Sequence, residues 1–471
     1  MRHLIKTTTI YSLAAMIGPV VALLLTPLYV TAIGVAGYGT VDLVQTVVQL
    51  LIPIALWALP TTLIARSTDD DVSHTPSRMY GSAIVLAVLV ASLLSGVCLL
   101  SAPIVASVTQ RPELSELLRM YALSLPSTTV YGVVLAILRL RAQVWRTVVL
   151  MLVYVLVLAL SRVGLVVWYD AGVSGMILAL TVTNVVVSLL GVALSWRWWW
   201  ARPEWSDIRQ FVHLGTPLLP ASLSIWVLLF IDRWFLVQYV SPLEQGQYAV
   251  AALVASLMAF LAEPFKQAWQ PMARHQTQPT FIAWSLTMYG AVALIAGVVV
   301  VTWAPELLWV IGGADARGAT PFIAWLIIAP LFSGVVTVVS MPAIQAQRTG
   351  LLAWATLVGA ITNIGLNMWL IPQYGAQGAA WATAVAALVI PLMHVRLHQP
   401  FYAISYDWPR LLGLGVLWCG YLFVLPYVAS SVLYRIALML LVIVCVGVLI
   451  NAWQWRQWGQ RLSALSQNST R

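Results

Sequence analysis

Long apolar stretches alternate with short polar connectors along almost the whole chain. A helix needs about 20 apolar residues to cross the roughly 30 Å hydrocarbon layer of a membrane, and such windows recur from Thr7 to Trp453. The pattern predicts fourteen membrane-spanning helices, with the bounds 7–32, 38–64, 80–102, 117–138, 147–168, 173–195, 213–239, 246–268, 281–304, 320–342, 350–371, 377–395, 409–427 and 431–453. We therefore expect an all-α polytopic membrane protein.

Basic residues gather on every second predicted connector. When the amino terminus is placed in the cytoplasm, most of the 24 Lys and Arg residues fall on the inner side. The outer side then carries Arg111, Arg119, Arg317 and Arg435. Because short cytoplasmic loops are enriched in Lys and Arg, the pattern predicts that both termini face the cytoplasm. The net charge of +9 does not indicate nucleic acid, since the basic residues form no single patch.

The composition excludes several function classes. The chain is 61% hydrophobic and 8% charged, whereas soluble domains carry about 25% charged residues. Arg2 and Lys6 precede an apolar run too long for a signal peptide, so we expect the first helix to be retained. The sequence holds neither a P-loop nor a zinc-type cluster, and its three cysteines lie within predicted helices. These features predict no catalytic residues, no metal and no cofactor, and the short connectors argue against a membrane glycan polymerase or ligase.

Three pairs of glycine-containing segments recur at offsets of 201, 203 and 209 residues. The pairs are Arg162-Val-Gly-Leu165 with Asn363-Ile-Gly-Leu366, Gly172-Val-Ser-Gly175 with Gly375-Ala-Gln-Gly378, and Gly37-Tyr-Gly39 with Gly246-Gln-Tyr248. The spacing predicts two six-helix lobes and two added helices, over residues 1–200, 201–400 and 401–471. A substrate path is expected between such lobes. The alternative is chance recurrence of glycines in helix-packing surfaces.

A few polar residues fall inside the predicted helices, where such groups usually face a cavity or a partner. Asp42, Gln45 and Gln49 share one face of the second helix because they are spaced i, i+3 and i+7. This stripe could line an aqueous lumen and bind hydroxyl-rich cargo. Alternatively, Asp42 lies at the membrane interface and the glutamines bond to neighbouring helices.

Two arginines also lie well inside predicted helices. Arg162 is about 15 residues into the fifth helix, or roughly 22 Å along its axis. Its guanidinium offers a fork of donors suited to phosphate, which makes it a candidate anion site. The alternatives are outward snorkelling or an ion pair with Asp42 or Asp232. Asp232 and Arg233 are adjacent, so we expect them to point about 100° apart without stacking on one another. One of them would face the cavity and the other a helix partner, unless both are structural.

Two further pairs of polar residues are spaced one turn apart. Glu263 and Lys266 can form an i, i+3 ion pair, although Lys266 can instead snorkel to the inner phosphates. Glu263 is a candidate proton or cation site. Asn363 and Asn367 share a helix face and either bind sugar hydroxyls or hold membrane helices together.

Several segments carry a family likeness. They are Phe211-Val-His-Leu-Gly-Thr-Pro-Leu-Leu-Pro220, Ile231-Asp-Arg-Trp-Phe-Leu236, Gly246-Gln-Tyr248, Gln267-Ala-Trp-Gln-Pro271, Gly365-Leu-Asn-Met-Trp-Leu-Ile-Pro372, Gly375-Ala-Gln-Gly-Ala-Ala380 and Ala36-Gly-Tyr-Gly39. Together they resemble the polysaccharide transport (O-antigen flippase) family of the multidrug/oligosaccharidyl-lipid/polysaccharide exporter superfamily. The likeness covers most of the chain, and the order and spacing of the segments carry it.

The resemblance implies a V-shaped pair of lobes with alternating access in the cell inner membrane. It implies a flippase that moves undecaprenyl-pyrophosphate-linked oligosaccharide to the outer leaflet for surface polysaccharide such as the O-antigen of lipopolysaccharide. Arg162 and Arg233 would then bind pyrophosphate. Asp42, Asp232 and Glu263 would be candidates for coupling to a proton or sodium ion. The expected partners are the lipid-linked glycan, membrane lipids and glycan polymerase machinery, and the alternatives are a lipid II flippase or a multidrug/cation antiporter of the same superfamily.

Overall fold

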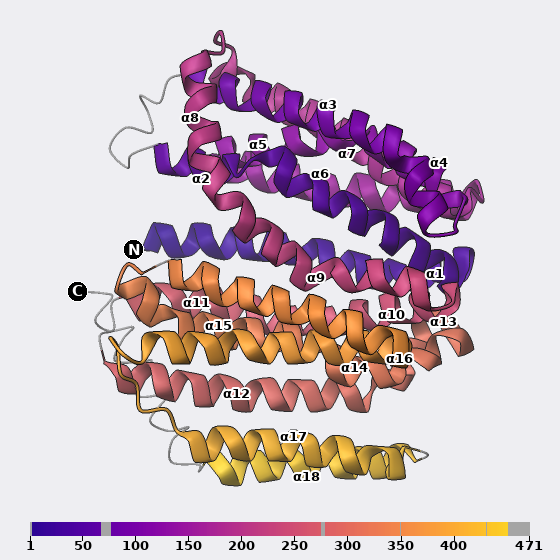
Figure 1. Ribbon diagram of the computed structural model, residues 1–471, viewed down its shortest axis with the longest axis vertical. Coiled ribbons are helices and arrows are strands. Elements are labelled where there is room, and N and C mark those ends of the chain that lie inside the picture. Colours follow the sequence, from indigo (N-terminus) through magenta and orange to yellow (C-terminus); the bar gives the residue numbers. More distant parts are fainter. Residues whose placement is uncertain (1, 67–76, 275–277, 349, 430, 451–471) are drawn as a thin grey trace.

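In a computed structural model, the protein is a bundle of long helices that run nearly parallel to one another (Figure 1). The structure describes all residues except 1, 67–76, 275–277, 349, 430 and 451–471. The described part contains no β-strand. It holds 11 helical segments that are long and apolar enough to cross a membrane, or up to 12 when one bent pair is counted as a span.

The first part of the chain forms seven α-helices among the described residues, together with one π-helix. They are α1 (Arg2–Leu56), α2 (Leu59–Arg66), α3 (Ser77–Val108), α4 (Glu113–Ala122), α5 (Leu125–Leu140), α6 (Val144–Arg162), η1 (Val163–Trp168, the π-helix) and α7 (Gly172–Trp199). The bent pair is α4 and α5, whose axes differ by 41°.

The rest of the chain forms α-helices and three short 3₁₀ turns among the described residues. The described elements are α8 (Trp205–Gly215), η2 (Thr216–Leu218), α9 (Leu219–Tyr239), α10 (Pro242–Ala255), η3 (Ser256–Met258), α11 (Ala259–Arg274), α12 (Pro279–Thr302), α13 (Ala304–Ala316), η4 (Arg317–Ala319), α14 (Thr320–Leu326), α15 (Ile328–Gln345), α16 (Gly350–His398), α17 (Trp408–Val428) and α18 (Val432–Ile450).

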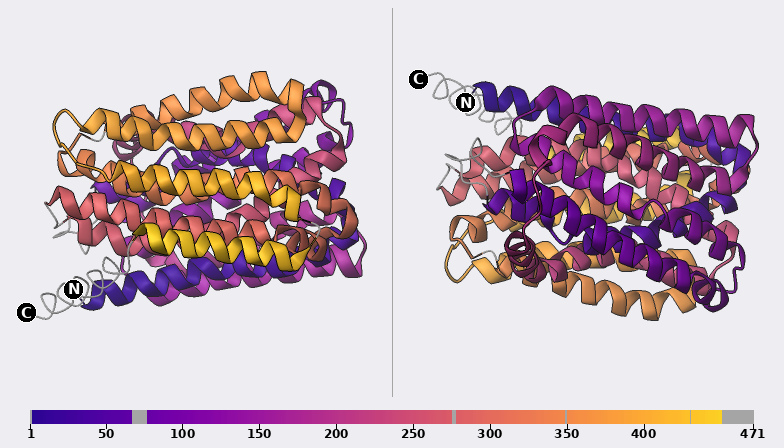
Figure 2. Two further views of the ribbon diagram at one scale, coloured as in Figure 1. Left: turned by 90° about the horizontal axis from the view of Figure 1, so that it is seen from below. Right: turned by 90° about the horizontal axis from the view of Figure 1, so that it is seen from above.

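The helices form two groups on either side of a central pair. Helices α3 to α7 lie on one side of the bundle and α10 to α16 on the other, with α1 and α9 between them (Figure 1). The last two helices, α17 and α18, run along the far edge (Figure 1). The start of α1 and the end of α18 lie at the same end of the bundle (Figure 2).

Two pairs of predicted helices are joined in the structure. The predicted spans 7–32 and 38–64 meet in α1, and 350–371 and 377–395 meet in α16. Each long helix is broken at a glycine with a non-helical backbone, Gly34 (φ 75°) or Gly375 (φ 55°). The sequence pattern also missed short helices such as α8 and α13, because their length is below that of a membrane span.

The glycine repeats noted in the sequence adopt matching conformations. Gly172 and Gly375 both have a left-handed backbone, with φ of 57° and 55°. Three residues later, a Cβ atom on Gly175 would lie 3.2 Å from the carbonyl oxygen of Leu165. A Cβ atom on Gly378 would lie 2.4 Å from that of Leu370. In both segments the first glycine permits the turn and the second permits close contact with the preceding helix.

The third glycine pair forms a direct contact between α1 and α10. A Cβ atom on Gly39 would lie 2.6 Å from the backbone nitrogen of Gly246. A Cβ atom on Gly246 would lie 2.0 Å from the carbonyl oxygen of Val35. The two backbones therefore touch, and α1 packs extensively on α10. This contact joins a segment of the first 200 residues to one of the next 200.

The edge helices are attached to the bundle by a bidentate ion pair. Arg435 on α18 is buried and binds Glu306 on α13 through both terminal guanidinium nitrogens. It also donates a 2.9 Å hydrogen bond to the carbonyl oxygen of Thr302. The hydroxyls of Thr302 and Tyr421 lie 2.8 Å apart, which ties α17 to α12.

Candidate functional site

Two carboxylates surround one guanidinium where α1 meets α9. Arg233 on α9 donates from Nε to Asp42 Oδ2 at 3.2 Å and from Nη1 to Asp232 Oδ1 at 2.8 Å. Tyr248 on α10 donates its hydroxyl to Asp232 Oδ2. The side chains of Arg233 and Asp232 are 10% and 4% exposed, whereas that of Asp42 is 27% exposed. We call Asp42, Asp232, Arg233 and Tyr248 the ion cluster.

The geometry of Asp232 and Arg233 differs from the sequence expectation. Adjacent residues on a helix point about 100° apart, which predicted that these two side chains would not stack. The long side chain of Arg233 instead turns back along α9, where Nη1 also donates to the carbonyl oxygen of Leu229 at 2.7 Å. The long, flexible side chain of Arg233 thus reaches Asp232 although the two Cβ atoms point apart. Its Nε and Nη1 atoms both donate hydrogen bonds.

Arg162 has a different environment, at the end of α6. It is partly buried and forms no ion pair with another described residue, neither with Asp42 nor with Asp232. Its Nε atom is buried without a hydrogen-bond partner among the described residues. The π-helix η1 begins at the next residue, and π-helical turns are frequent at functional sites.

Four tyrosines lie near this guanidinium. The side chain of Arg162 lies 5.8 Å from the ring centroid of Tyr29. It also interacts electrostatically with the hydroxyl groups of four residues, Tyr29, Tyr38, Tyr121 and Tyr154. We call these four residues the tyrosine cluster. They come from both arms of α1, from α4 and from α6, so no local sequence pattern predicts that they meet.

Tyr38 connects the tyrosine cluster with the ion cluster. It interacts electrostatically with both Asp42 and Arg162. Tyr38 on α1 is therefore near polar groups of both clusters. Tyr38 and Tyr248 lie within the two glycine segments that the sequence repeat paired, which is the one signal that pointed to them.

The glutamine stripe also lies on α1. Gln45 and Gln49 are both partly buried, and neither forms a hydrogen bond with another described residue. Between them, the indole nitrogen of Trp226 on α9 donates a 3.2 Å hydrogen bond to the carbonyl oxygen of Thr46. The stripe thus follows the contact between α1 and α9, with amide groups that keep free donors and acceptors.

The two asparagines of α16 bind each other. Asn367 Nδ2 donates to Asn363 Oδ1 at 3.0 Å, and both residues are buried. Their remaining buried atoms, Asn363 Nδ2 and Asn367 Oδ1, have no partner among the described residues. Helix α16 packs on α9, so this geometry favours the helix-packing interpretation over a site for sugar hydroxyls.

Glu263 forms the expected ion pair. Its carboxylate contacts the ammonium group of Lys266 at the i, i+3 spacing on α11. The side chain of Glu263 is 49% exposed, so it is the most accessible of the acidic candidates. Within the described residues, no group of three or more His, Cys, Asp and Glu side chains is arranged to hold a metal ion.

A family model of polysaccharide biosynthesis proteins matches residues 4–276, more than half of the chain. The chain belongs to this family. The matched region includes the ion cluster, Arg162, the glutamine stripe and Glu263, but not Asn363 and Asn367. The polysaccharide biosynthesis family is the one that the sequence segments resembled.

Two relatives align with part of the chain. A probable low-salt glycan biosynthesis flippase of Haloferax volcanii is 19% identical over 217 residues, which cover 45% of this chain and 46% of the relative. The DNA damage-inducible protein F of Escherichia coli K12 is 29% identical over 214 residues, which cover 41% of this chain and 45% of that protein. The chain thus spans slightly less than half the length of these relatives.

Solved structures share the fold over nearly the whole chain. The lipid II flippase MurJ in an inward closed conformation superposes with a TM-score of 0.74 at 13% identity, covering 93% of this chain and 98% of that one. An inward-facing multidrug resistance MATE family transporter superposes with a TM-score of 0.61 at 15% identity, covering 87% and 99%. This member of the polysaccharide biosynthesis family is therefore a multi-pass membrane protein with the fold of flippases and transporters of the exporter superfamily.

Proposed function

We propose that this protein is a flippase that moves undecaprenyl-pyrophosphate-linked oligosaccharide units from the inner to the outer leaflet of the cell inner membrane. It would work by alternating access and supply surface polysaccharide synthesis, where a glycan polymerase takes up the product. The family match supports the glycan class. The observation that carries the cargo assignment is Arg162, a guanidinium that has no carboxylate partner among the described residues.

An anionic head group fits the surroundings of Arg162. Charged groups inside membrane helices usually have a partner, and Arg162 is surrounded by neutral hydroxyl groups instead. A pyrophosphate would supply the missing negative charge, and a guanidinium binds phosphate oxygens in a bidentate manner. Arg233 suits this role less well, because Asp42 and Asp232 already occupy its donors.

The glycan would contact the polar stripe next to this anion site. Gln45 and Gln49 offer amide donors and acceptors without partners among the described residues. Such amides hydrogen-bond to sugar hydroxyls regardless of the sugar identity. The stripe lies between the first and second halves of the chain, which is where a substrate path is expected in repeated transporters.

The proposal includes fourteen membrane crossings with both termini in the cytoplasm. Helices α1 and α16 each contribute to apolar segments of 49 residues, which would extend about 74 Å if straight. That length is more than twice the roughly 30 Å hydrocarbon layer. The breaks at Gly34 and Gly375 would let each segment cross twice, giving two lobes of six helices, residues 1–200 and 201–400, and two added helices.

The ion cluster is our proposed coupling site. It places two carboxylates around one guanidinium, so it carries one excess negative charge when both carboxylates are ionised. A proton or a sodium ion would cancel this charge. Asp42 and Asp232 come from different halves of the chain, so neutralisation would change the attraction between the two halves. Glu263 is a weaker candidate because Lys266 already balances its charge.

Reconstituted transport tests the function directly. The purified protein would be placed in liposomes that contain a fluorescent undecaprenyl-pyrophosphate oligosaccharide, and a membrane-impermeant quencher would report its transfer between leaflets. We expect protein-dependent transfer of this lipid and slower transfer of fluorescent lipid II. Faster transfer of lipid II would favour the alternative flippase. Chemical change of the glycan without transfer would contradict the proposal.

Arg162→Ala tests the anion site in the same assay. Loss of a hydrogen bond to a charged group costs roughly 1.5–3 kcal/mol, so we expect at least about a tenfold weaker apparent affinity for the lipid-linked glycan. Arg119→Ala is the matched control, because Arg119 is exposed near the same end of the first half. Equal activity of Arg162→Ala and the native protein would exclude the anion site.

A further inference from the structure

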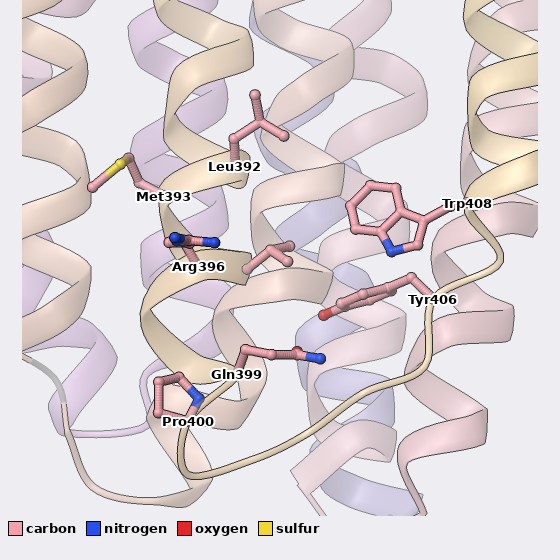
Figure 3. Close-up of a pocket in the computed structure, with 8 residues that line it drawn as sticks. Leu392, Met393, Arg396, Gln399, Pro400, Tyr406 and Trp408 are labelled. Atoms are coloured by element: carbon pink, nitrogen blue, oxygen red, sulfur yellow. The ribbon is translucent and has the colours of Figure 1, made fainter.

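A cavity of the described chain is lined by residues that belong to none of the clusters above. It has a volume of about 860 Å³ and lies where α16 ends and α17 begins. Figure 3 shows side chains that line it: Leu392, Met393 and Arg396 on α16, Gln399, Pro400 and Tyr406 in the connector, and Trp408 at the start of α17. The cavity opens at the end of two membrane-spanning helices, the level at which lipid head groups lie.

One positive charge in the cavity has no counter-charge. Arg396 is exposed and forms no ion pair or hydrogen bond with another described residue. No acidic residue lines the cavity. The nearby carboxylate of Asp407 is bound to the guanidinium of Arg410 and does not compensate Arg396.

The remaining polar groups hold the cavity wall in place. The hydroxyl of Tyr406 and the Nε2 atom of His398 lie 2.9 Å apart. Gln399 donates to the carbonyl oxygen of Ile404 at 3.2 Å. The connector between α16 and α17 is thus built around bonded groups, and Arg396 is the cationic donor left available for a ligand.

Apolar residues continue from the cavity along both helices. On α16 the exposed residues Val385, Leu388 and Leu392 are spaced i, i+3 and i+7, so they share one face. On α17 the exposed residues Trp408, Leu412 and Val416 share a face in the same way. Leu392 and Trp408 also line the cavity, so a ligand held there would contact apolar surface on both helices.

We propose that this cavity binds an anionic glycerophospholipid of the membrane. Its phosphate would bind Arg396, its glycerol would lie beside Trp408, and its acyl chains would follow the two apolar faces. Tryptophan is enriched at the level of lipid head groups, and single basic residues near the membrane surface attract anionic lipids. The site depends on the chain spanning a membrane and not on which glycan it transports.

Native mass spectrometry of the purified full-length protein in detergent tests this proposal. Phosphatidylglycerol and phosphatidylcholine with identical acyl chains would be titrated separately, and the fraction of lipid-bound protein measured. We expect phosphatidylglycerol to bind more tightly. Arg396→Gln should weaken phosphatidylglycerol binding about fivefold and leave phosphatidylcholine binding unchanged.

Arg202→Gln is the matched control, because Arg202 is an exposed arginine predicted on the same membrane side but away from the cavity. Equal weakening by the two variants would show non-specific attraction and overturn the site. Equal binding of phosphatidylglycerol to Arg396→Gln and to the native protein would also overturn the site. Displacement of phosphatidylglycerol by an undecaprenyl-pyrophosphate glycan would assign the cavity to cargo instead, which would also overturn the lipid proposal. The transport assay in liposomes fails or succeeds independently of these outcomes.

Discussion

Arg162 and Arg233 have opposite electrostatic surroundings. Arg233 has two carboxylate neighbours at 2.8 and 3.2 Å, so its charge is more than compensated within the protein. Arg162 has tyrosine hydroxyls instead. An incoming anion meets no resident carboxylate at Arg162 but would be repelled by the ion cluster. These surroundings are the reason why we propose Arg162 for cargo binding and the carboxylates around Arg233 for ion coupling.

Charge counting predicts the effect of removing one carboxylate. Asp232→Asn leaves Arg233 balanced by Asp42, so we expect nearly normal folding but loss of stimulation by a proton or sodium gradient. Transport assays in liposomes with and without each gradient measure this effect. Asp315→Asn removes an exposed acidic residue outside the cluster and should keep the stimulation. Unchanged stimulation in Asp232→Asn would place coupling elsewhere, with Glu263 as the next candidate.

Removing both carboxylates should affect stability as well. Asp42→Asn combined with Asp232→Asn leaves the buried guanidinium of Arg233 uncompensated, and breaking a buried ion pair in this way costs about 3–5 kcal/mol. We expect a clearly lower thermal unfolding temperature in detergent for the double variant than for either single variant. If the double variant lowers the unfolding temperature only by the sum of two small single-variant effects, the two carboxylates do not share Arg233.

The sequence singled out the charged residues inside the apolar helices, but it did not indicate the tyrosines that lie near Arg162. Asp42, Arg162 and Arg233 stand out because charges are rare in apolar helices. Tyr29, Tyr121 and Tyr154 do not stand out, because tyrosine is common at membrane interfaces and the three residues come from distant segments. Which helix faces meet is decided by tertiary packing, and periodicity within one helix carries no information about it.

At the scale of helices, the length of the apolar stretches predicted where the helices lie. It did not predict which helices continue through a connector. The structure places helices at the predicted spans, for instance α3 at 80–102 and α12 at 281–304. It continues α1 and α16 through connectors that were predicted as separate turns, because one left-handed glycine suffices to redirect a helix. For α16 the glycine repeat indicated the position of this turn, since Gly375 has a positive φ like its counterpart Gly172; Gly34 in α1 lies outside the repeat pairs.

Gly375 should therefore be sensitive to substitution. In Gly375→Ala the Cβ atom would lie 2.4 Å from Glu244 Oε1, and the left-handed backbone costs an alanine roughly 1–2 kcal/mol. We expect a lower unfolding temperature in detergent. Gly365→Ala in the same helix is the matched control, because its Cβ atom meets nothing within 4 Å. Gly365→Ala should be neutral or stabilising. A lower unfolding temperature for Gly365→Ala than for Gly375→Ala would contradict the assignment of the turn to Gly375.

Helix α18 offers a second test at this scale. Arg435→Gln removes the bidentate contact with Glu306 and the hydrogen bond to Thr302. The expected loss of stability is about 1.5–3 kcal/mol, measured as thermal unfolding in detergent. Because Glu306 has already lost its partner in Arg435→Gln, adding Glu306→Gln should cost little more. Full additivity of the two changes would show that the pair does not attach α18 to α13.

For the whole molecule, the distribution of charge predicts orientation. Two arginines of the predicted inner side form ion pairs with α8 and the residue before it: Arg66 binds Asp207 at 2.8 Å and Arg78 binds Glu204 at 2.6 Å. Arg435, from the predicted outer side, is explained by its ion pair within the protein. This pairing gives a structural reason for one of the four basic residues that were predicted on the outer side.

Single-cysteine labelling tests this orientation. In a variant with Cys98, Cys419 and Cys445 replaced by serine, we would introduce either Tyr169→Cys or Ala346→Cys, both at exposed positions in connectors. A membrane-impermeant maleimide added to intact cells should label the first variant and not the second. Both should react after the cells are permeabilised, which controls for accessibility. Since the two connectors are predicted on opposite sides, the reverse result would invert the whole topology. The proposed direction of transport would then have to be inverted with it, because Arg162 lies near the outer end of α6 only in the orientation proposed here.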